Sequence, residues 1–320
     1  MNALVCHLTK CSPGSMVASV RIANYVAQQL GAPLVHTEED VARCTDEQLQ
    51  ALDLFVLVNS PTGFAPEAVR RFSAEGLWLA RNAVFVNNDY KMRPPSQSKS
   101  HQQRRWGKHR AEAGDYYGYS LWSTVPGQLR PARYPLDSYV NWNQLTYEPR
   151  DGMTHVDREP GVLYWGALRK GREGRLRQLL HGQFPVTVST APQSVQKFKE
   201  FLPNANYVGQ LNPLIAALTR YRATIYTHDD WSDTAYCSLA NRFYEALSAG
   251  MAILVDARCT GTFKRAGLSM EPEWIVRSHD DVARALANAE RIAVDQVRWR
   301  EHYQTLLKEQ LHAAVAKVSV

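Results

Sequence analysis

The sequence predicts an α/β protein with two domains, each built on a doubly wound parallel sheet. Three observations lead to this fold class. The 320 residues suffice for two ordinary domains, and a hydrophobic content of 45% can fill two cores. Short apolar runs alternate with helical patterns, which is the rhythm of β-α-β units. The alternation occurs twice, on either side of a polar, proline-containing stretch at Glu148–Pro160.

The first half opens directly with a strand pattern. Apolar runs of strand length are separated by segments in which apolar residues recur at helical spacing. The predicted strands are Ala3–Leu8, Pro33–His36, Leu54–Asn59 and Ala83–Asn87, and the predicted helices are Met16–Leu30, Asp46–Leu52 and Pro66–Ala80.

Residues 116–147 depart from this alternation and are rich in Tyr, Trp and Pro. One interpretation is a wrapping segment that covers the edge of the sheet and packs hydrophobically. The alternative is an aromatic wall on which nucleic-acid bases stack.

The second half repeats the alternation and ends in helices. We place the linker near residue 155 and expect domains at 1–155 and 156–296, followed by a C-terminal helix at 297–320. The predicted strands are Gly161–Trp165, Pro185–Ser189, Asn206–Val208, Ala223–Thr227 and Met251–Asp256, and the predicted helices are Arg172–His181, Pro213–Tyr221, Leu239–Gly250, Asp280–Ile292 and Val297–Ala316.

The positive charge of the chain is concentrated in one segment. Residues 91–110 contain seven Lys or Arg and no Asp or Glu, and without these seven the formal net charge of +6 becomes −1. Proline, serine and glutamine make the segment a loop, and a polyanion is its natural partner. The plainer alternative is a solvated basic loop. The candidate DNA-binding residues are Lys91, Arg93, Lys99, Arg104, Arg105, Lys108 and Arg110.

Cysteine usage and hydropathy favour a cytosolic protein. The five cysteines lack Cys-x-x-Cys spacing, which argues against structural zinc and a disulfide framework. No apolar run approaches the ~20 residues of a membrane span, and no basic leader precedes the first strand. We therefore expect a cytoplasmic protein with no membrane partner. We also expect it to be a monomer.

Arg242 and Glu245 form the most informative pair in the chain. They lie three residues apart at the start of a predicted helix, so they share one helical face. Free N–H groups at a helix N-terminus and an arginine can hold a diphosphate, while a carboxylate can hold ribose hydroxyl groups. The plainer alternative is an ordinary ion pair at the start of an amphipathic helix.

A second candidate anion site follows the strand Gly161–Trp165. The strand ends at Gly166, and a helix begins near Gly171, with Arg169 and Arg172 beside that helix N-terminus. Ligands of doubly wound sheets bind at such carboxyl ends of strands. Together with Arg242 and Glu245, these residues favour a diphosphate-binding site over a basic surface turn.

Four segments resemble one known family. The sequence is similar to the DNA β-glucosyltransferases of T-even bacteriophages, which transfer glucose from UDP-glucose to 5-hydroxymethylcytosine in duplex DNA. The correspondence runs colinearly over most of the chain. The segments are Val58-Asn59-Ser60, Asn88-Asp89 before the basic loop, Tyr164-Trp165-Gly166-Ala167-Leu168-Arg169, and Arg242-Phe243-Tyr244-Glu245 followed by the strand that ends at Asp256.

The resemblance implies a fold, a donor site and a base. The fold would be GT-B, in which two Rossmann-like domains face a central cleft and the C-terminal helix returns to the first domain. Arg169, Arg172 and Arg242 would hold the UDP diphosphate, although the alignment at Arg172 needs a one-residue shift. Glu245 would bind the ribose and Asp89 would be the catalytic base. A divalent cation, Mg²⁺ or Mn²⁺, would assist the release of UDP.

The position of Asp89 supports a catalytic role on independent grounds. It follows the apolar strand Ala83–Asn87, so its carboxylate lies at the carboxyl end of that strand. An inverting transfer needs a base within ~3 Å of the acceptor hydroxyl and cationic stabilisation of departing UDP. The plainer alternative is a turn or cap residue.

The loop after the first strand departs from the family pattern. The T-even enzymes carry a glutamate there that contacts the sugar region, whereas residues 9–16 here contain no acidic side chain. Gly14 and Ser15 could still present N–H groups to the donor. The identity of the sugar stays open, as does the choice between 5-hydroxymethylcytosine and 5-hydroxymethyluracil as the flipped base.

The sequence therefore favours a DNA glycosyltransferase that binds duplex DNA through residues 91–110 and flips a hydroxymethylated pyrimidine into the cleft. One alternative is a related transferase acting on a small molecule, glycan or protein, which leaves the basic loop without a role. The other is a non-catalytic nucleic-acid-binding protein, which leaves Arg242, Glu245 and Asp89 unexplained.

Overall fold

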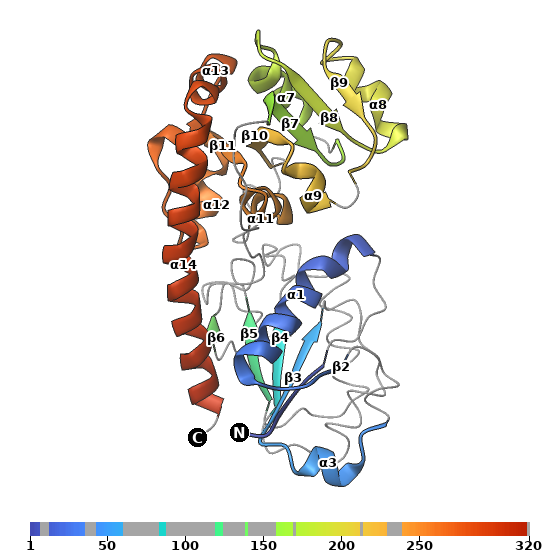
Figure 1. Ribbon diagram of the computed structural model, residues 1–320, viewed down its shortest axis with the longest axis vertical. Coiled ribbons are helices and arrows are strands. Elements are labelled where there is room, and N and C mark those ends of the chain that lie inside the picture. The colour runs from blue at the N-terminus through green and yellow to red at the C-terminus, as the bar shows by residue number, and fades with distance from the viewer. Residues whose placement is uncertain are drawn as a thin grey trace, which may run out of the picture. The chain divides into compact units, whose positions relative to one another are not determined.

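The chain divides into two compact units in the computed structural model shown in Figure 1. The first comprises Met1–Thr146 and Gln304–Val320, and the second comprises Tyr147–Tyr303. Each unit is described by itself. The structure describes residues 1–6, 13–35, 43–59, 83–87, 119–123, 138–139, 158–168, 171–211, 214–228 and 239–318.

The first unit contains a six-stranded parallel sheet with the order β2-β1-β3-β4-β5-β6. Helix α1 (Pro13–Leu30) begins three residues before its predicted start, with proline in the first turn, where its missing N–H costs no hydrogen bond. The short helix α3 begins with a capping box at Thr45. The elements are β1 (Ala3–Cys6), β2 (Leu34–Val35), α3 (Asp46–Gln50), β3 (Leu54–Asn59), β4 (Ala83–Asn87), β5 (Tyr119–Ser123) and β6 (Ser138–Tyr139).

Strands β5 and β6 correct the expectation for residues 116–147. The sheet continues there, because β5 pairs in parallel with β4 from Ala83↔Tyr119 to Asn87↔Ser123, and β6 pairs with β5. The sequence of β5 mixes serine with aromatic residues, so the apolar run that marks a buried parallel strand is missing. Aromatic residues nevertheless favour a pleated sheet.

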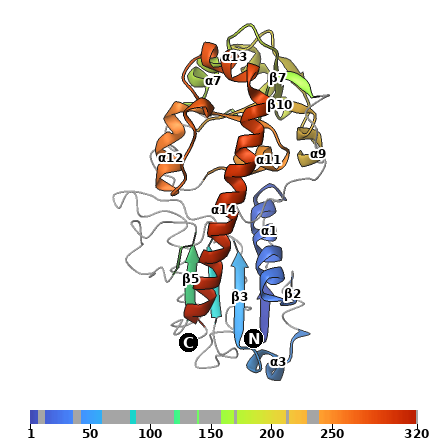
Figure 2. The ribbon, with the colours of Figure 1, turned by 60° about the vertical axis from the view of Figure 1, so that its left-hand side comes forward.

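The core of the first unit includes the end of the chain. Buried residues of β1 and β3 pack with Ile22 and Val26 of α1. Leu307, Leu311 and Ala314, from the long helix α14 (Ala289–Val318), belong to the same cluster. Both ribbon views show α14 as one continuous helix (Figures 1 and 2).

The second unit contains another six-stranded parallel sheet, with the order β12-β11-β10-β7-β8-β9. Strands β8 and β9 are added on one side of β7, and β10, β11 and β12 are added on the other side, as in doubly wound folds. The strands are β7 (Glu159–Trp165), β8 (Val186–Ser189), β9 (Asn206–Val208), β10 (Tyr221–Tyr226), β11 (Ala252–Asp256) and β12 (Ile275–Val276).

Helices cover both faces of this sheet. Successive residues of β7 alternate between two buried clusters: Val162 and Tyr164 belong to one, and Leu163 and Trp165 to the other. A parallel strand buried on both faces reads as a continuous apolar run, which is why the sequence predicted it. The helices are α7 (Glu173–Leu180), α8 (Pro192–Lys199), α9 (Leu214–Leu218), α11 (Asn241–Ser248), α12 (Thr260–Arg265) and α13 (His279–Ala287), with 3₁₀ turns η4 (Ala257–Cys259) and η5 (Pro272–Trp274).

Two helices and one strand of this unit were not predicted, and the break between the last two helices was misplaced. Helices α8 and α12 are short and largely polar, and β12 has only two residues. The predicted break between the last two helices, at residues 293–296, lies instead at Asn288, which caps α13. Gln296 is buried within α14, where its amide exchanges two hydrogen bonds, of 2.9 and 2.8 Å, with the backbone of Ile253.

Candidate functional site

Three strands of the second sheet end at the same edge. Because β7, β10 and β11 are parallel, their carboxyl ends at Trp165, Tyr226 and Asp256 lie along one side of the sheet. Gly166 and Thr227 follow two of these ends directly, and α11 starts beyond β10. This edge is where doubly wound sheets bind ligands.

Arg242, in the first turn of α11, joins two of the strand ends. Its Nη1 donates to the Trp165 carbonyl at 3.3 Å, and its Nη2 donates to the Thr227 carbonyl at 2.8 Å. The guanidinium carbon lies 5.4 Å from the centre of the Tyr164 ring. These contacts fix a positive charge where β7 and β10 end, beside the N-terminus of α11.

Gly166 provides the backbone turn that this arrangement requires. Its φ of 121° lies in the region that side chains rarely adopt. A Cβ atom there would lie 3.7 Å from Cδ of Arg242, so the glycine adjoins the arginine directly. The Gly166 amide donates to the Ser189 carbonyl at 3.1 Å, and its carbonyl accepts from the Thr190 hydroxyl at 3.2 Å.

Tyr164 lies between two arginines in the interior of the unit. Its hydroxyl accepts from Nη1 of Arg172 at 3.1 Å, and its ring faces Arg242. Burial alone would raise the pKa of the Tyr164 hydroxyl, but the positive charges of Arg242 and Arg172 outweigh burial and lower it below its ordinary value. Arg172 itself is buried at the N-cap of α7 and also donates to the Ala167 carbonyl at 3.4 Å.

Glu245 lies on α11 one turn after Arg242 and is 9% exposed. Its Oε2 accepts from the indole Nε1 of Trp165 at 3.2 Å. The carboxylate is therefore oriented by the last residue of β7, at the edge where Arg242 is also anchored.

Tyr226 and His228 mark the end of β10. The Tyr226 hydroxyl accepts from the Ala240 amide at 2.8 Å and lies 2.7 Å from Nε2 of His228. Burial raises the pKa of Tyr226, so the hydroxyl keeps its proton in the hydrogen bond that it shares with His228. These bonds connect the end of β10 to the residue that precedes α11.

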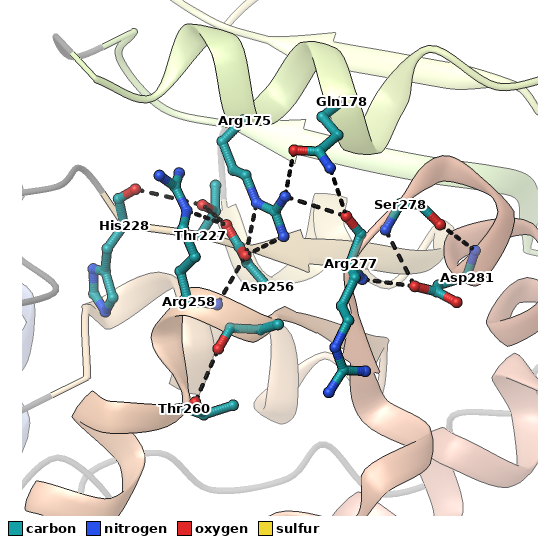
Figure 3. A network of polar contacts seen from close by, with 11 residues as sticks. Arg175, Gln178, Thr227, His228, Asp256, Arg258, Thr260, Arg277, Ser278 and Asp281 are labelled. Carbon is teal, nitrogen blue, oxygen red and sulfur yellow. Dashed lines mark hydrogen bonds and ion pairs between the residues drawn. The ribbon is translucent and has the colours of Figure 1, made fainter.

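Asp256, the last residue of β11, is the centre of the polar network in Figure 3. Its Oδ2 accepts from the Thr227 hydroxyl at 2.7 Å, and its Oδ1 accepts from Nε of Arg175 at 2.8 Å. The Arg258 amide also donates to Oδ1, at 3.1 Å. The carboxylate is completely buried, and it is held by groups from α7, from η4 and from Thr227, which directly follows β10.

Four of the predicted donor-binding residues lie in the second unit: Gly166, Arg172, Arg242 and Glu245. Gly14 and Ser15 lie in the first turn of α1, in the first unit, where backbone N–H groups have no partner within the helix. Their roles remain predictions. The other predicted site residues lie outside the described part of the chain: Asp89, Arg169, Lys91, Arg93, Lys99, Arg104, Arg105, Lys108 and Arg110.

Sequence reasoning did not assign roles to Tyr164, Thr227, His228, Asp256 or Arg175. Three of them carried a usable signal, because Thr227, His228 and Asp256 are polar residues at the ends of apolar strands. Tyr164 lies inside an apolar strand, and Arg175 is one of several arginines after Gly166. Only the tertiary contacts distinguish these two residues.

Comparisons with solved structures show the fold. The chain is similar to a mutant of the T4 phage enzyme BGT in complex with UDP-glucose, with a TM-score of 0.62 and 12% identity over all of both chains. A second structure, of the DNA-modifying enzyme β-glucosyltransferase, matches with a TM-score of 0.62 and 11% identity over 99% of each chain. Anabaena HepE in complex with UDP-glucose matches with a TM-score of 0.55 and 11% identity over 99% of this chain and 100% of the other.

No protein-family model matches the sequence, and no curated protein matches it significantly. At 11–12% identity, the structural matches concern the fold and not the activity. The chain thus has the α/β fold of these glycosyltransferases, with two parallel sheets, as the sequence predicted.

Neither a metal group nor a membrane span is found in the described part of the chain. The described residues gather no group of three or more His, Cys, Asp or Glu that could hold a metal ion. None of the helices searched there is both long and apolar enough to cross a bilayer.

Proposed function

We propose that this protein is a UDP-sugar-dependent glycosyltransferase whose donor site is the carboxyl edge of the second sheet. The observation that carries the proposal is the anchoring of Arg242 to the Trp165 and Thr227 carbonyls at the N-terminus of α11. A fixed guanidinium beside the N-terminus of a helix is suited to a diphosphate. The structures of T4 phage BGT and Anabaena HepE, each in complex with UDP-glucose, support a UDP-glucose donor.

The donor would bind in a defined orientation. Arg242 and Arg169 would together hold the diphosphate. Arg172, which donates a hydrogen bond to the Tyr164 hydroxyl, would add positive charge to the site. Glu245 would accept hydrogen bonds from the ribose hydroxyl groups, in the orientation that Trp165 gives it. As the glycosidic bond breaks, the two phosphates gain negative charge, and the arginines stabilise it. No step of this scheme is assigned to a divalent cation.

We propose duplex DNA that contains a 5-hydroxymethylpyrimidine, first of all 5-hydroxymethylcytosine, as the acceptor. Two observations support this choice: the similarity of the fold to T4 phage BGT and the concentration of seven basic residues in 91–110. The target base would be flipped into the site by unstacking. In this scheme residues 1–155 bind DNA and residues 156–296 bind the donor, while the C-terminal helix is α14, which begins at Ala289.

Asp89 would remove the proton from the acceptor hydroxyl while that oxygen attacks the anomeric carbon of the sugar. The bond from the sugar to UDP breaks in the same step, so the configuration at the anomeric carbon inverts. In the sequence, Asp89 comes two residues after the last residue of β4. The role of Asp89 rests on this position and on the resemblance described above.

The proposal is tested by incubating the protein with radiolabelled UDP-glucose and other UDP-sugars. The acceptors are duplexes that contain 5-hydroxymethylcytosine, 5-hydroxymethyluracil, 5-methylcytosine or unmodified cytosine. We expect label only on the hydroxymethylated duplexes, with a β linkage by NMR of the released nucleoside. Asp89→Asn should lower turnover by about 10²–10⁴-fold while UDP and DNA affinities change little.

The other outcomes identify the alternatives. Label transferred only to a small molecule, glycan or protein would replace DNA as the acceptor and keep the donor site. DNA binding with no UDP binding would contradict the enzyme and leave a nucleic-acid-binding protein. A retained α linkage would contradict the single-displacement step.

A further inference from the structure

We propose that Asp256 and Thr227 are positioning residues that orient Arg242 for the diphosphate. The inference rests on the proposed function and extends it to residues that do not touch the donor. Asp256 holds the side chain of Thr227, and the main chain of Thr227 holds Arg242. The network thus runs from the interior of the unit to the arginine at the strand ends.

The first step is the hydrogen bond between Thr227 and Asp256. The Thr227 hydroxyl has one proton and two acceptors in reach: Oδ2 of Asp256 at 2.7 Å and the His228 carbonyl at 3.4 Å. The shorter contact, to an ionised acceptor, is the stronger one. Thr227 is completely buried, so water does not compete for this proton. The side chain of Thr227 is therefore directed at Asp256 (Figure 3).

The second step passes through the backbone of Thr227. Its carbonyl accepts from Nη2 of Arg242 at 2.8 Å, which is shorter than the 3.3 Å bond from Nη1 to the Trp165 carbonyl. A β-branched side chain is stiff at χ1, and the allowed χ1 rotamer depends on the backbone φ and ψ, so fixing the Thr227 side chain restricts the adjoining backbone. The Thr227 carbonyl is the closer of the two acceptors that hold Arg242, and its position thus depends on the Thr227 hydroxyl.

The third step concerns charge. A buried carboxylate near a phosphate site would repel the ligand unless it were neutralised. Nη2 of Arg175 lies 2.7 Å from Oδ1 of Asp256, and Nε of Arg258 lies 3.7 Å from Oδ2. These two arginines compensate the Asp256 charge, so that Asp256 can order Thr227 without cancelling the positive charge of Arg242.

Arg175 is in turn held by its own element and by the loop before α13. Its Nη1 donates to the Arg277 carbonyl at 3.2 Å, and Gln178 of α7 donates to the same carbonyl at 3.0 Å. The network therefore joins α7, the residue after β10, the end of β11 and the loop after β12. Because each of these residues is held by contacts from several elements, the network keeps the Arg242 side chain in one geometry.

The inference is tested by a double-mutant cycle on UDP affinity. Thr227→Val removes the hydroxyl at nearly constant volume, and Thr227→Ser keeps it. We expect Thr227→Val to weaken UDP binding about tenfold, as outer partners of metal ligands do at the lower end of their range. Thr227→Ser should restore affinity to within about twofold of wild type. Thr227→Ala removes the same hydroxyl without adding a methyl group and serves if the valine variant does not fold.

The decisive comparison is made in an Arg242→Ala background. Because Thr227 acts through Arg242, Thr227→Val should there change UDP affinity by less than about twofold. Thr224→Val, the same change at a buried threonine within β10, should leave UDP affinity unchanged in both backgrounds.

Each other outcome contradicts a specific statement. An equal loss from Thr227→Val with and without Arg242 would overturn the inference and leave the donor site in place. The same conclusion would follow if Thr227→Ser failed to restore binding. Absence of UDP binding by the wild-type protein would overturn the proposed function and this inference with it.

Discussion

At the scale of single residues, the site is governed by how its charges are partnered. Tyr164 shows this most clearly, because two arginines act on a hydroxyl that burial would otherwise keep protonated. The pKa of its hydroxyl in the folded protein is below the value of about 10 in the unfolded chain. The tyrosinate therefore stabilises the folded state above about pH 10, and this contribution is lost as pH falls through the folded-state pKa.

An alkaline absorbance titration measures this effect. The difference between wild type and Tyr164→Phe should show one tyrosine ionising below pH 10, and bound UDP should move that ionisation to higher pH because phosphate offsets the arginines. Tyr207→Phe is the control, since burial raises the pKa of Tyr207 and its loss should alter only the titration above pH 10. A difference spectrum confined to pH values above 10 for Tyr164 would refute the arrangement.

Glu245 provides a second prediction at this scale. Glu245→Gln keeps an oxygen for the Trp165 indole but removes the charge, so the hydrogen bonds to ribose should weaken. We expect the preference for UDP over its dideoxyribose analogue to fall about tenfold or more, since a hydrogen bond to a charged group is worth about 1.5–3 kcal/mol. Calorimetry with both ligands measures the preference. An unchanged preference in the folded variant would remove Glu245 from ribose recognition.

At the scale of elements, the turn after β7 depends on one glycine. Gly166→Ala forces a side chain into a φ of 121° and should destabilise the second unit by about 1–3 kcal/mol. It should also weaken UDP binding, because the Trp165 carbonyl that anchors Arg242 adjoins the turn. Gly174→Ala is the matched control: it lies in α7 with open space around it and should stabilise by about 0.5–1 kcal/mol. Urea unfolding compares the two, and equal effects would show that the turn is not strained.

The elements also show what the sequence could and could not predict. Buried strands such as β7 and β11 were predictable because both of their faces are covered and each contains an unbroken apolar run, at residues 162–165 and 252–255. Strand β5 was not, since its serines interrupt the apolar run. The spacing of Arg242 and Glu245 predicted a shared helical face. It could not predict that Trp165, eighty residues earlier, binds Glu245, or that Thr227 and Asp256 connect to Arg242. Contacts between distant strand ends follow from the tertiary fold and not from local patterns.

At the scale of the whole molecule, the charge distribution predicts a salt-dependent interaction with DNA. Replacing Arg104, Arg105 and Lys108 by glutamine should flatten the dependence of log affinity on log salt concentration by up to ~3, about one for each lost phosphate contact. UDP affinity should stay the same. A wild-type salt dependence in the triple variant would show that DNA binds elsewhere.

The most direct test of the donor site is UDP binding measured by calorimetry in wild type, Arg242→Gln and Arg220→Gln. Arg220 is an exposed arginine paired with Glu159, so it controls for loss of one positive charge. We predict that wild type and Arg220→Gln bind UDP equally and that Arg242→Gln binds at least about tenfold more weakly, since charge-assisted hydrogen bonds contribute about 1.5–3 kcal/mol. Wild-type affinity for UDP in a folded Arg242→Gln protein would contradict the site.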